Sequence, residues 1–364
     1  MRYKLSFTAA LALAAVSGSL GAADFPSAEI SNGIVKAKIY LPDANRGFYR
    51  STRFDWSGMI ASLEYKGHNF YGPWFYRIDP DVYDLAYDEK GVISAPFTAA
   101  LGPAEEFGGD GGALGFAEAR PGGTFIKIGV GVLRKPMNGE PPVPVRPAAF
   151  SGRGGGPDRY DHSRAYTLVD SGKWQVKTRK DSVEFTQHLT DAPDGYDYVY
   201  RKVVRLLPGK PEMVIEHSLK NAGQKAIKAT VYNHNFLVMD GQGPSQDFSM
   251  AVPFPIVSPR PPSAGLLEAK GNQLTYLRAP VGEERATAAI QGFGDAARDY
   301  DIRVENKKLG AGFRVTGDRP LSSLAVWSIR TVNAVEPYNA MDIAPGQEFT
   351  WTLRYEYYTL PVAK

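Results

Sequence analysis

Residues 213–236 read MVIEHSLKNAGQKAIKATVYNHNF, and this stretch contains the pattern that decides the fold class. Apolar and polar side chains alternate over residues 213–219, and this run ends at the turn Asn221-Ala222-Gly223. A second strand-like run follows over residues 226–236. Alternation with a period of two is typical of a β-strand with one buried face. The stretch therefore predicts two strands separated by a turn.

Similar strand patterns recur along most of the chain. Outward from that stretch they cover residues 198–207, 182–189, 34–40, 312–316, 324–332 and 349–357. Turn dipeptides such as Pro208-Gly209 and Pro345-Gly346 separate them. No amphipathic helix longer than about three turns is evident. The sequence therefore predicts an all-β protein, a β-sandwich of large, mostly antiparallel sheets.

The composition excludes several classes of function. A net charge of +3 on 364 residues is weak and argues against nucleic acid as a partner. Cysteine is absent, which excludes disulfides, thiolate metal sites and a cysteine nucleophile. The aromatic content of 12% suits stacking on sugar rings, although ordinary sheet packing accounts for it equally well.

The first 23 residues are typical of a secretory signal peptide. Arg2 and Lys4 form a basic start, residues 5–16 are apolar, and residues 17–23 are small. The apolar run is too short to span a bilayer, and no later stretch is long and apolar enough to do so. We therefore expect an exported protein, periplasmic or secreted, without a membrane span.

Two stretches interrupt the strand pattern. Residues 102–123 are rich in glycine, and residues 135–157 are rich in proline and glycine. The second could be an interdomain linker or a long loop over a sheet. The loop is favoured, because strand patterns of the same character lie on both sides, so we expect one domain over residues 24–364 with both stretches rimming a cleft.

No cofactor or metal is expected. The glycine-rich stretch lacks the spacing of a phosphate-binding loop. Residues 191–197 are acidic enough to hold calcium, but they lack EF-hand spacing, and a turn rich in Asp and Gly is the simpler interpretation.

His234 is the first candidate for chemistry. With a period of two it shares one strand face with Tyr232 and Phe236. A histidine between aromatics on a sheet is often a hydrogen-bonded core residue. Asn233 and Asn235 flank it, however, and three polar residues in a row at a strand end suggest a wet cleft instead.

Glu336 is the second candidate. Pro337 follows it, removes a backbone donor and keeps Glu336 extended, so the carboxylate is expected at the end of a strand. A solvated loop glutamate is the alternative. A histidine and a carboxylate can form a general acid/base pair if the fold brings them to one cleft, with a ligand between them.

Three segments resemble the aldose 1-epimerase (galactose mutarotase) superfamily. They are Asn233 to Gly241 (NHNFLVMDG), Val335-Glu336-Pro337 with Pro345-Gly346 following, and Gly58 to Gly67 (GMIASLEYKG). The order and separation of the first two segments also match. The resemblance implies the superfamily's β-sandwich, a cleft for a free sugar or saccharide end, and His234 and Glu336 as catalytic acid and base without a cofactor. Asn233 and Tyr338 are expected to contact the sugar.

The match is incomplete in one place. Many relatives carry a second histidine in a His-Gly-Gly segment, where this chain reads Glu105-Glu106-Phe107-Gly108-Gly109. Glu106 could contact sugar hydroxyls instead. Arg53 is a further candidate, because related enzymes place an early arginine in the sugar site, although a structural ion pair is equally plausible.

The expected activity is interconversion of sugar anomers at C1. The alternatives are a non-catalytic carbohydrate-binding or polysaccharide-processing accessory protein on the same fold, and a lyase or hydrolase that uses the same cleft.

Overall fold

The computed structural model describes residues 25–109, 112–141, 160–190, 192 and 195–361. Within these residues the regular structure is almost entirely β, which confirms the predicted all-β class. The largest element is a ten-stranded antiparallel sheet. In spatial order its strands are β12 (Lys173–Thr178), β13 (Ser182–Leu189), β14 (Tyr198–Leu206), β15 (Glu212–Asn221), β25 (Glu348–Thr359), β22 (Ala311–Gly317), β21 (Asp301–Asn306), β17 (Phe248–Ala251), β19 (Gln273–Tyr276) and β18 (Leu267–Lys270).

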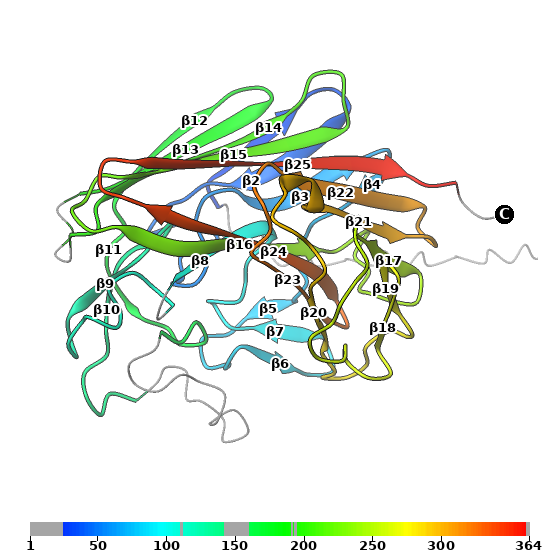
Figure 1. Cartoon of the computed structure of the whole chain (residues 1–364), viewed down its shortest axis with the longest axis horizontal. Helices are drawn as coiled ribbons and strands as arrows, with labels where there is room; N and C mark the ends of the chain where they lie inside the picture. Colours follow the sequence, from blue (N-terminus) through cyan, green and yellow to red (C-terminus); the bar gives the residue numbers. More distant parts are fainter. Residues whose placement is uncertain (1–24, 110–111, 142–159, 191, 193–194, 362–364) are drawn as a thin grey trace, which may run out of the picture.

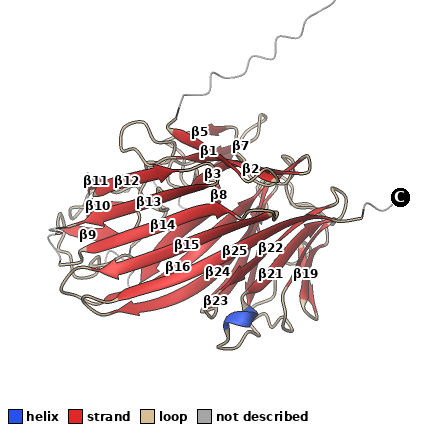
Figure 2. Ribbon diagram, turned by 90° about the horizontal axis from the view of Figure 1, so that it is seen from above, coloured by secondary structure: helices blue, strands red, loops and turns tan. Residues whose placement is uncertain are grey.

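A five-stranded antiparallel sheet lies beneath it (Figure 1). Its order is β20 (Ala286–Ile290), β23 (Ser323–Ile329), β24 (Val332–Ile343), β16 (Ile227–Leu237) and β8 (Gly102–Gly109). The long strands β14, β15 and β25 run side by side in the view from above (Figure 2).

Three smaller sheets complete the described part of the chain. One contains β1 (Ser27–Ser31), β2 (Val35–Tyr40), β3 (Met59–Tyr65) and β4 (His68–Asn69). The second contains β11 (Thr167–Asp170), β10 (Gly131–Arg134) and β9 (Thr124–Lys127). The third, below the five-stranded sheet in Figure 1, contains β5 (Arg77–Ile78), β7 (Val92–Ser94) and β6 (Leu85–Tyr87). A 3₁₀ helix, η2, spans Ala297–Asp299, and no helix among the described residues is long and apolar enough to cross a membrane.

Aromatic side chains fill the space between the two large sheets. Phe107 of β8 packs against Tyr200 of β14 and Trp351 of β25, with ring centroids 5.3 Å and 6.1 Å apart. All three are buried, and full burial of one large apolar side chain contributes roughly 1.5–3 kcal/mol. Because polar and apolar side chains alternate along the strands, each of the two large sheets presents an apolar face to the other.

The predicted strands agree with the observed ones where alternation is strong. The prediction for residues 182–189 coincides with β13, and that for residues 226–236 differs from β16 by one residue at each end. The prediction for residues 324–332 was wrong at its end, because β23 stops at Ile329 and Val332 already begins β24.

The glycine-rich stretch was also interpreted wrongly in part. Its first eight residues form β8, an edge strand of the five-stranded sheet. Gly102 begins this strand with φ +65°, and a Cβ there would lie 2.8 Å from Cβ of Ile60, so only glycine fits. Of the stretch 135–157, residues 142–159 lie outside the described residues.

Candidate functional site

His234 and Glu336 lie opposite each other on neighbouring strands of the five-stranded sheet. In the register of β16 and β24, Tyr232 pairs with Tyr338 and Asn235 pairs with Val335, which sets His234 across from Glu336. His234 Nε2 lies 3.1 Å from Glu336 Oε1. The two side chains thus share one face, but they touch directly. A ligand that reaches both groups therefore approaches them from one side, and the expected ligand contacts stay a prediction.

Glu336 sits in the interior of β24, not at a strand end as expected. The strand does not end there, because β24 continues through Pro337 although proline is unusual inside a central strand. The pairing of β16 with β24 is interrupted opposite it, where proline has no N–H to donate. The side-chain amide of Asn235 donates to the carbonyl oxygens of Asn233 (3.1 Å) and Val335 (2.8 Å) and so supplies hydrogen bonds at the gap.

The pair is enclosed by aromatic rings. The His234 ring stacks on Phe236 at 3.8 Å between centroids, and Phe54 and Trp327 contact it edge-on at 5.9 Å and 5.5 Å. The His234 and Glu336 side chains are only 5% and 13% exposed. This enclosure removes water from both titratable groups.

Burial shifts the two pKa values in opposite directions. It lowers the pKa of His234 well below the ordinary value, and the nearby Arg53 lowers it further. It raises the pKa of Glu336 to about 7, although Arg53 and the hydrogen bond from Tyr338 oppose the shift. Below about pH 7, and above the lowered pKa of His234, the pair therefore holds one proton, and the carboxyl group is its preferred position.

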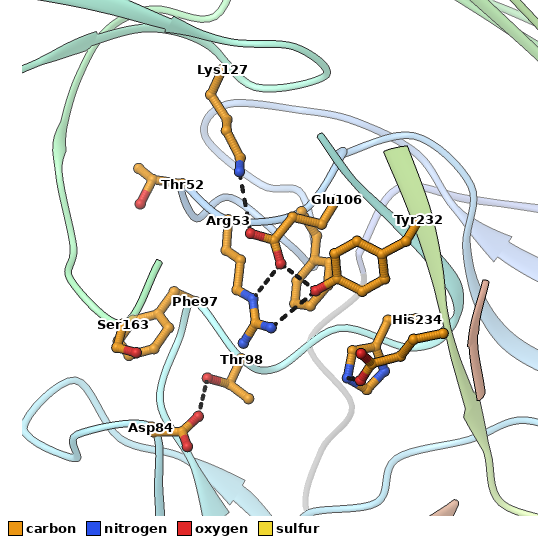
Figure 3. Close-up of polar contacts among 12 residues, drawn as sticks. Thr52, Arg53, Asp84, Phe97, Thr98, Glu106, Lys127, Ser163, Tyr232 and His234 are labelled. Atoms are coloured by element: carbon orange, nitrogen blue, oxygen red, sulfur yellow. Dashed lines mark hydrogen bonds and ion pairs between the residues drawn. The ribbon is translucent and has the colours of Figure 1, made fainter. Parts of the chain in front are cut away.

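Arg53 and Glu106 form the second part of the site. Arg53 Nε lies 2.7 Å from Glu106 Oε2, and Lys127 Nζ lies 3.2 Å from Glu106 Oε1. The Tyr232 hydroxyl donates to Glu106 and accepts from Arg53 at 3.2 Å. Figure 3 shows Glu106 at the centre of these contacts, with His234 beside them. Glu106 is thus occupied by protein partners, and the structural ion pair considered for Arg53 is present.

The cations around Glu106 outweigh the effect of burial on it. Burial alone would raise the pKa of Glu106, but the charges of Arg53 and Lys127 hold it well below its usual range. Glu106 is therefore a permanent anion that positions Arg53 next to the catalytic candidates. Lys127 was not predicted as a site residue, because its only signal in the sequence is a charge within the apolar run Phe125-Ile126-Lys127-Ile128.

Tyr338 lies next to Glu336 on the same face of β24, and its expected contact with a sugar stays a prediction. Its hydroxyl donates to Glu336 Oε2 at 3.3 Å, and its ring stacks on Tyr232 at 4.4 Å. The hydroxyl favours the charged form of Glu336, so Tyr338 modulates the acid/base candidate from the same face.

Asn233 lies on the other face of β16 from His234. Its side chain is buried and donates to Glu105 Oε1 at 2.9 Å, between the two large sheets. The expectation that Asn233 contacts the sugar was therefore wrong. The row of three polar residues reflects two different polar environments, one on each face of the strand.

Glu105 is the centre of the polar cluster between the sheets. Lys202 bonds both Glu105 and Asp55, and His217 Nε2 lies 2.9 Å from Glu105 Oε1. The hydroxyl of Tyr200 donates to Asp55 at 3.0 Å. Burial would raise the pKa of Glu105, but Lys202 and His217 hold it at about 2. This cluster ties both sheets together behind the site.

His162 belongs to the surroundings of the site. Its side chain is exposed. Burial and Arg53 have the larger effects on the pKa of His234, and the positive charge of a protonated His162 lowers that pKa further. His162 therefore lies within electrostatic reach of the pair. Among the described residues, no group of three or more His, Asp or Glu side chains is arranged to hold a metal ion.

A cavity of about 370 Å³ opens next to Glu336. Its lining includes Ala325 and Trp327 of β23, Ala289 of β20 and the loop residue Arg260. A larger cavity, about 410 Å³, lies between the turns near Gly33 and Gly67 and is not lined by the residues of the pair. The smaller one is the relevant space, because it reaches the titratable pair.

No family model matches the chain, and no curated protein matches it. Solved structures do match. Slr1438 protein from Synechocystis sp. PCC 6803 is 12% identical, covers 98% of this chain and 100% of its own, and gives a TM-score of 0.50. The GalM/aldose epimerase homologue from C. elegans is 14% identical over 92% of this chain and 99% of its own, with a TM-score of 0.52. The fold is that of the galactose mutarotase-like superfamily.

A third structure with the mutarotase-like fold agrees. The galactose mutarotase related enzyme from Lactobacillus acidophilus is 12% identical over 93% of this chain and 99% of its own, with a TM-score of 0.51. The likeness therefore extends over the described sheets, and the superfamily that the sequence motifs resembled is confirmed as the fold. At such identities a shared mutarotase-like fold leaves the chemistry to be argued from the site.

Proposed function

We propose that this protein is an aldose 1-epimerase-like enzyme that interconverts the α and β anomers of a reducing sugar. The observation that carries the proposal is the contact of His234 Nε2 with Glu336 Oε1 at 3.1 Å, beside a cavity that opens onto Glu336. A titratable pair with pKa values shifted in opposite directions, in a pocket, is a common sign of acid/base function.

The reaction needs two proton transfers that balance within the pair. The Glu336 carboxylate takes the proton of the C1 hydroxyl while the His234 imidazolium gives its proton to the ring oxygen. The bond between C1 and the ring oxygen breaks, and the C1 carbonyl forms. After rotation about C1–C2, closure on the other face of the carbonyl returns both protons. No redox partner is required.

The resting pair already contains the proton that this mechanism uses. A protonated Glu336 next to neutral His234 and a charged Glu336 next to imidazolium hold the same number of protons. Transfer across the 3.1 Å contact converts the first form to the second. Arg53 is positioned by Glu106 so that its charge favours the carboxylate form of Glu336.

The test is proton-NMR anomer exchange with a panel of reducing sugars. We expect Glu336→Gln and His234→Asn each to lose about 10²- to 10⁴-fold in enzymatic exchange, because Gln cannot accept the C1 proton and Asn cannot protonate the ring oxygen. Sugar affinity should fall less than turnover. Glu64→Gln, at an exposed glutamate of β3, is the matched control and should exchange like wild type. Wild-type exchange in either site variant would remove that residue from the mechanism.

The second candidate is a non-catalytic carbohydrate-binding or polysaccharide-processing accessory protein. It is favoured by the environment of Glu106, which stands where many relatives have a histidine and whose carboxylate is already bonded by Arg53, Lys127 and Tyr232. Measurable sugar affinity without exchange in the wild type would select this alternative.

Export to the periplasm or the medium remains part of the proposal. It is supported by the basic, apolar and small-residue order of residues 1–23, which lie outside the described residues. N-terminal sequencing of the protein from an exported fraction tests it, and a start near Asp24 is the expected result.

A further inference from the structure

The cavity beside Glu336 runs across the strands to the edge of the five-stranded sheet. Ala325 pairs with Glu336, and Ala289 pairs with Ala325, so the three residues form a row across β24, β23 and β20. Neighbouring strands lie about 4.8 Å apart, which gives the row a length of about 10 Å. Both alanines are partly exposed and line the cavity. Because the alanine side chains are small, they leave open space over the sheet next to Glu336.

The walls of this groove carry the groups that a sugar needs. The half-buried Trp327 side chain lines the groove and also contacts the ring of His234. Its indole N–H makes no hydrogen bond with the described residues, and Arg260, which is exposed, forms no ion pair with them. An aromatic face, together with a few polar groups, is typical of a ligand site.

The groove is longer than a single bound sugar requires. One pyranose ring placed over the His234–Glu336 pair covers the inner end of the row. The floor at Ala289 and the side chains of Thr287 and Arg260 then remain uncovered at the outer end. A volume of about 370 Å³ lies in the range of sites for ligands larger than a monosaccharide.

We propose that the outer half of this groove is a subsite for a second sugar unit, so that the substrate is the reducing end of an oligosaccharide. The proposal rests on the function proposed above for the site, since it places the reacting ring over the His234–Glu336 pair. The second ring lies on the alanine floor next to Trp327, and the saccharide leaves the protein over β20, the edge strand.

The test compares monosaccharides with disaccharides by isothermal titration calorimetry. The probes are glucose with cellobiose and maltose, xylose with xylobiose, and galactose with 1,4-β-galactobiose. We expect at least one disaccharide to bind about tenfold more tightly than its monosaccharide, which corresponds to 1.4 kcal/mol. Ala289→Leu fills the outer half of the groove and should abolish this gain, while monosaccharide affinity stays within about twofold.

The matched control is Ala340→Leu, at an exposed alanine of β24 on the same face as Glu336 but outside the groove. It should keep the preference for the disaccharide. If Ala289→Leu does not fold, Ala289→Val is the second variant, because valine is favoured in strands. Disaccharides that bind no more tightly than their monosaccharides, or a gain that survives in the folded groove variant, would overturn the proposal.

Anomer exchange of the same sugars separates this inference from the function on which it rests. A disaccharide gain that Ala289→Leu removes, in a protein without exchange, would leave the subsite in place and refute the epimerase. Exchange without a preference for disaccharides would refute the subsite alone.

Discussion

Glu105 is buried and Glu336 largely buried, on opposite faces of the same five-stranded sheet, and their surroundings shift their pKa values in opposite directions. Glu105 contacts a lysine, a histidine and an asparagine between the large sheets, and its pKa is held at about 2 against the effect of burial. Among the described residues, Glu336 is bonded by His234 and the hydroxyl of Tyr338, and burial raises its pKa to about 7.

The difference shows that partners decide what a buried carboxylate does. Burial penalises the charge of both residues, but of the two only Glu105 has a lysine or arginine of the described part of the chain, Lys202, in direct contact with its carboxylate. Glu105 is therefore a fixed anion that joins the sheets. Glu336 is poised to gain or lose a proton near neutral pH, which is what a general acid/base requires.

The largest expected effect is a difference in stability between Glu105→Gln and Glu336→Gln, which place the same substitution on the two faces of the sheet. Glu105→Gln leaves Lys202 in a dry interior with a weakened set of partners, so the free energy of unfolding should fall by about 3–5 kcal/mol. Glu336→Gln replaces a carboxyl group that is protonated near pH 5 and has no such cation among the described residues, so the free energy of unfolding should change by less than about 1 kcal/mol at that pH. Denaturant unfolding of both variants measures this, and equal losses of stability would remove the contrast between the faces.

The pH dependence of stability should have opposite signs for the two glutamates. An unfolded glutamate has a pKa of about 4.3. Glu105 titrates lower when folded, so its stabilisation is lost as the pH falls from about 4 towards 2. Glu336 titrates higher when folded, so wild-type stability relative to Glu336→Gln should fall by up to about 3 kcal/mol as the pH rises from about 4 to 7.

Urea unfolding of wild type and both Gln variants at several pH values tests these slopes. Subtracting each variant from the wild type cancels the groups that they share. A difference for Glu336 that stays constant between pH 4 and 8 would show that its carboxyl group is not perturbed.

The activity should respond to the same proton. Below about pH 7 the His234–Glu336 pair holds one proton, and above it the pair holds none, so His234 can no longer protonate the ring oxygen. We expect kcat/KM for anomer exchange to fall about tenfold per pH unit above that value. Saturation-transfer NMR across pH 5–9, corrected for exchange without enzyme, gives the profile, and a level rate up to pH 9 would contradict the assignment.

The smallest expected effect is at Tyr338. Tyr338→Phe keeps the stacked ring on Tyr232 and removes the hydrogen bond to Glu336, which is worth about 0.5–1.5 kcal/mol. Because that bond lowers the pKa of Glu336, the alkaline limit of activity should move upward by up to about one pH unit. A downward shift would mean that the hydroxyl favours the protonated acid.

Strong alternation made much of the fold predictable. Residues 182–189 alternate without interruption and form β13 over the same residues. Alternation also correctly grouped Tyr232, His234 and Phe236 on one face of β16. The strands that were not predicted correctly contain residues that ordinarily weaken strands, namely the glycines of β8 and Pro337 in β24.

The site was predictable only in part, because a strand pattern does not say which face meets a second sheet. His234 and Asn233 look equally polar in the sequence, yet one faces the candidate site and the other bonds Glu105 between the sheets. The pairing of Glu105 with Lys202 joins residues 97 positions apart, and no local pattern reveals it.

Pro337 has a consequence for how this sequence can change during evolution. Its missing N–H leaves a gap in the pairing of β16 with β24, and the amide of Asn235 donates to the carbonyls of Asn233 and Val335 there. Loss of Asn235 alone would deprive two buried carbonyls of a donor and the buried Tyr355 hydroxyl of its acceptor, whereas the loss costs less once position 337 regains an N–H that can donate across the gap. Positions 235 and 337 are thus expected to covary among homologues, and the order in which the two substitutions arise should decide whether the intermediate folds.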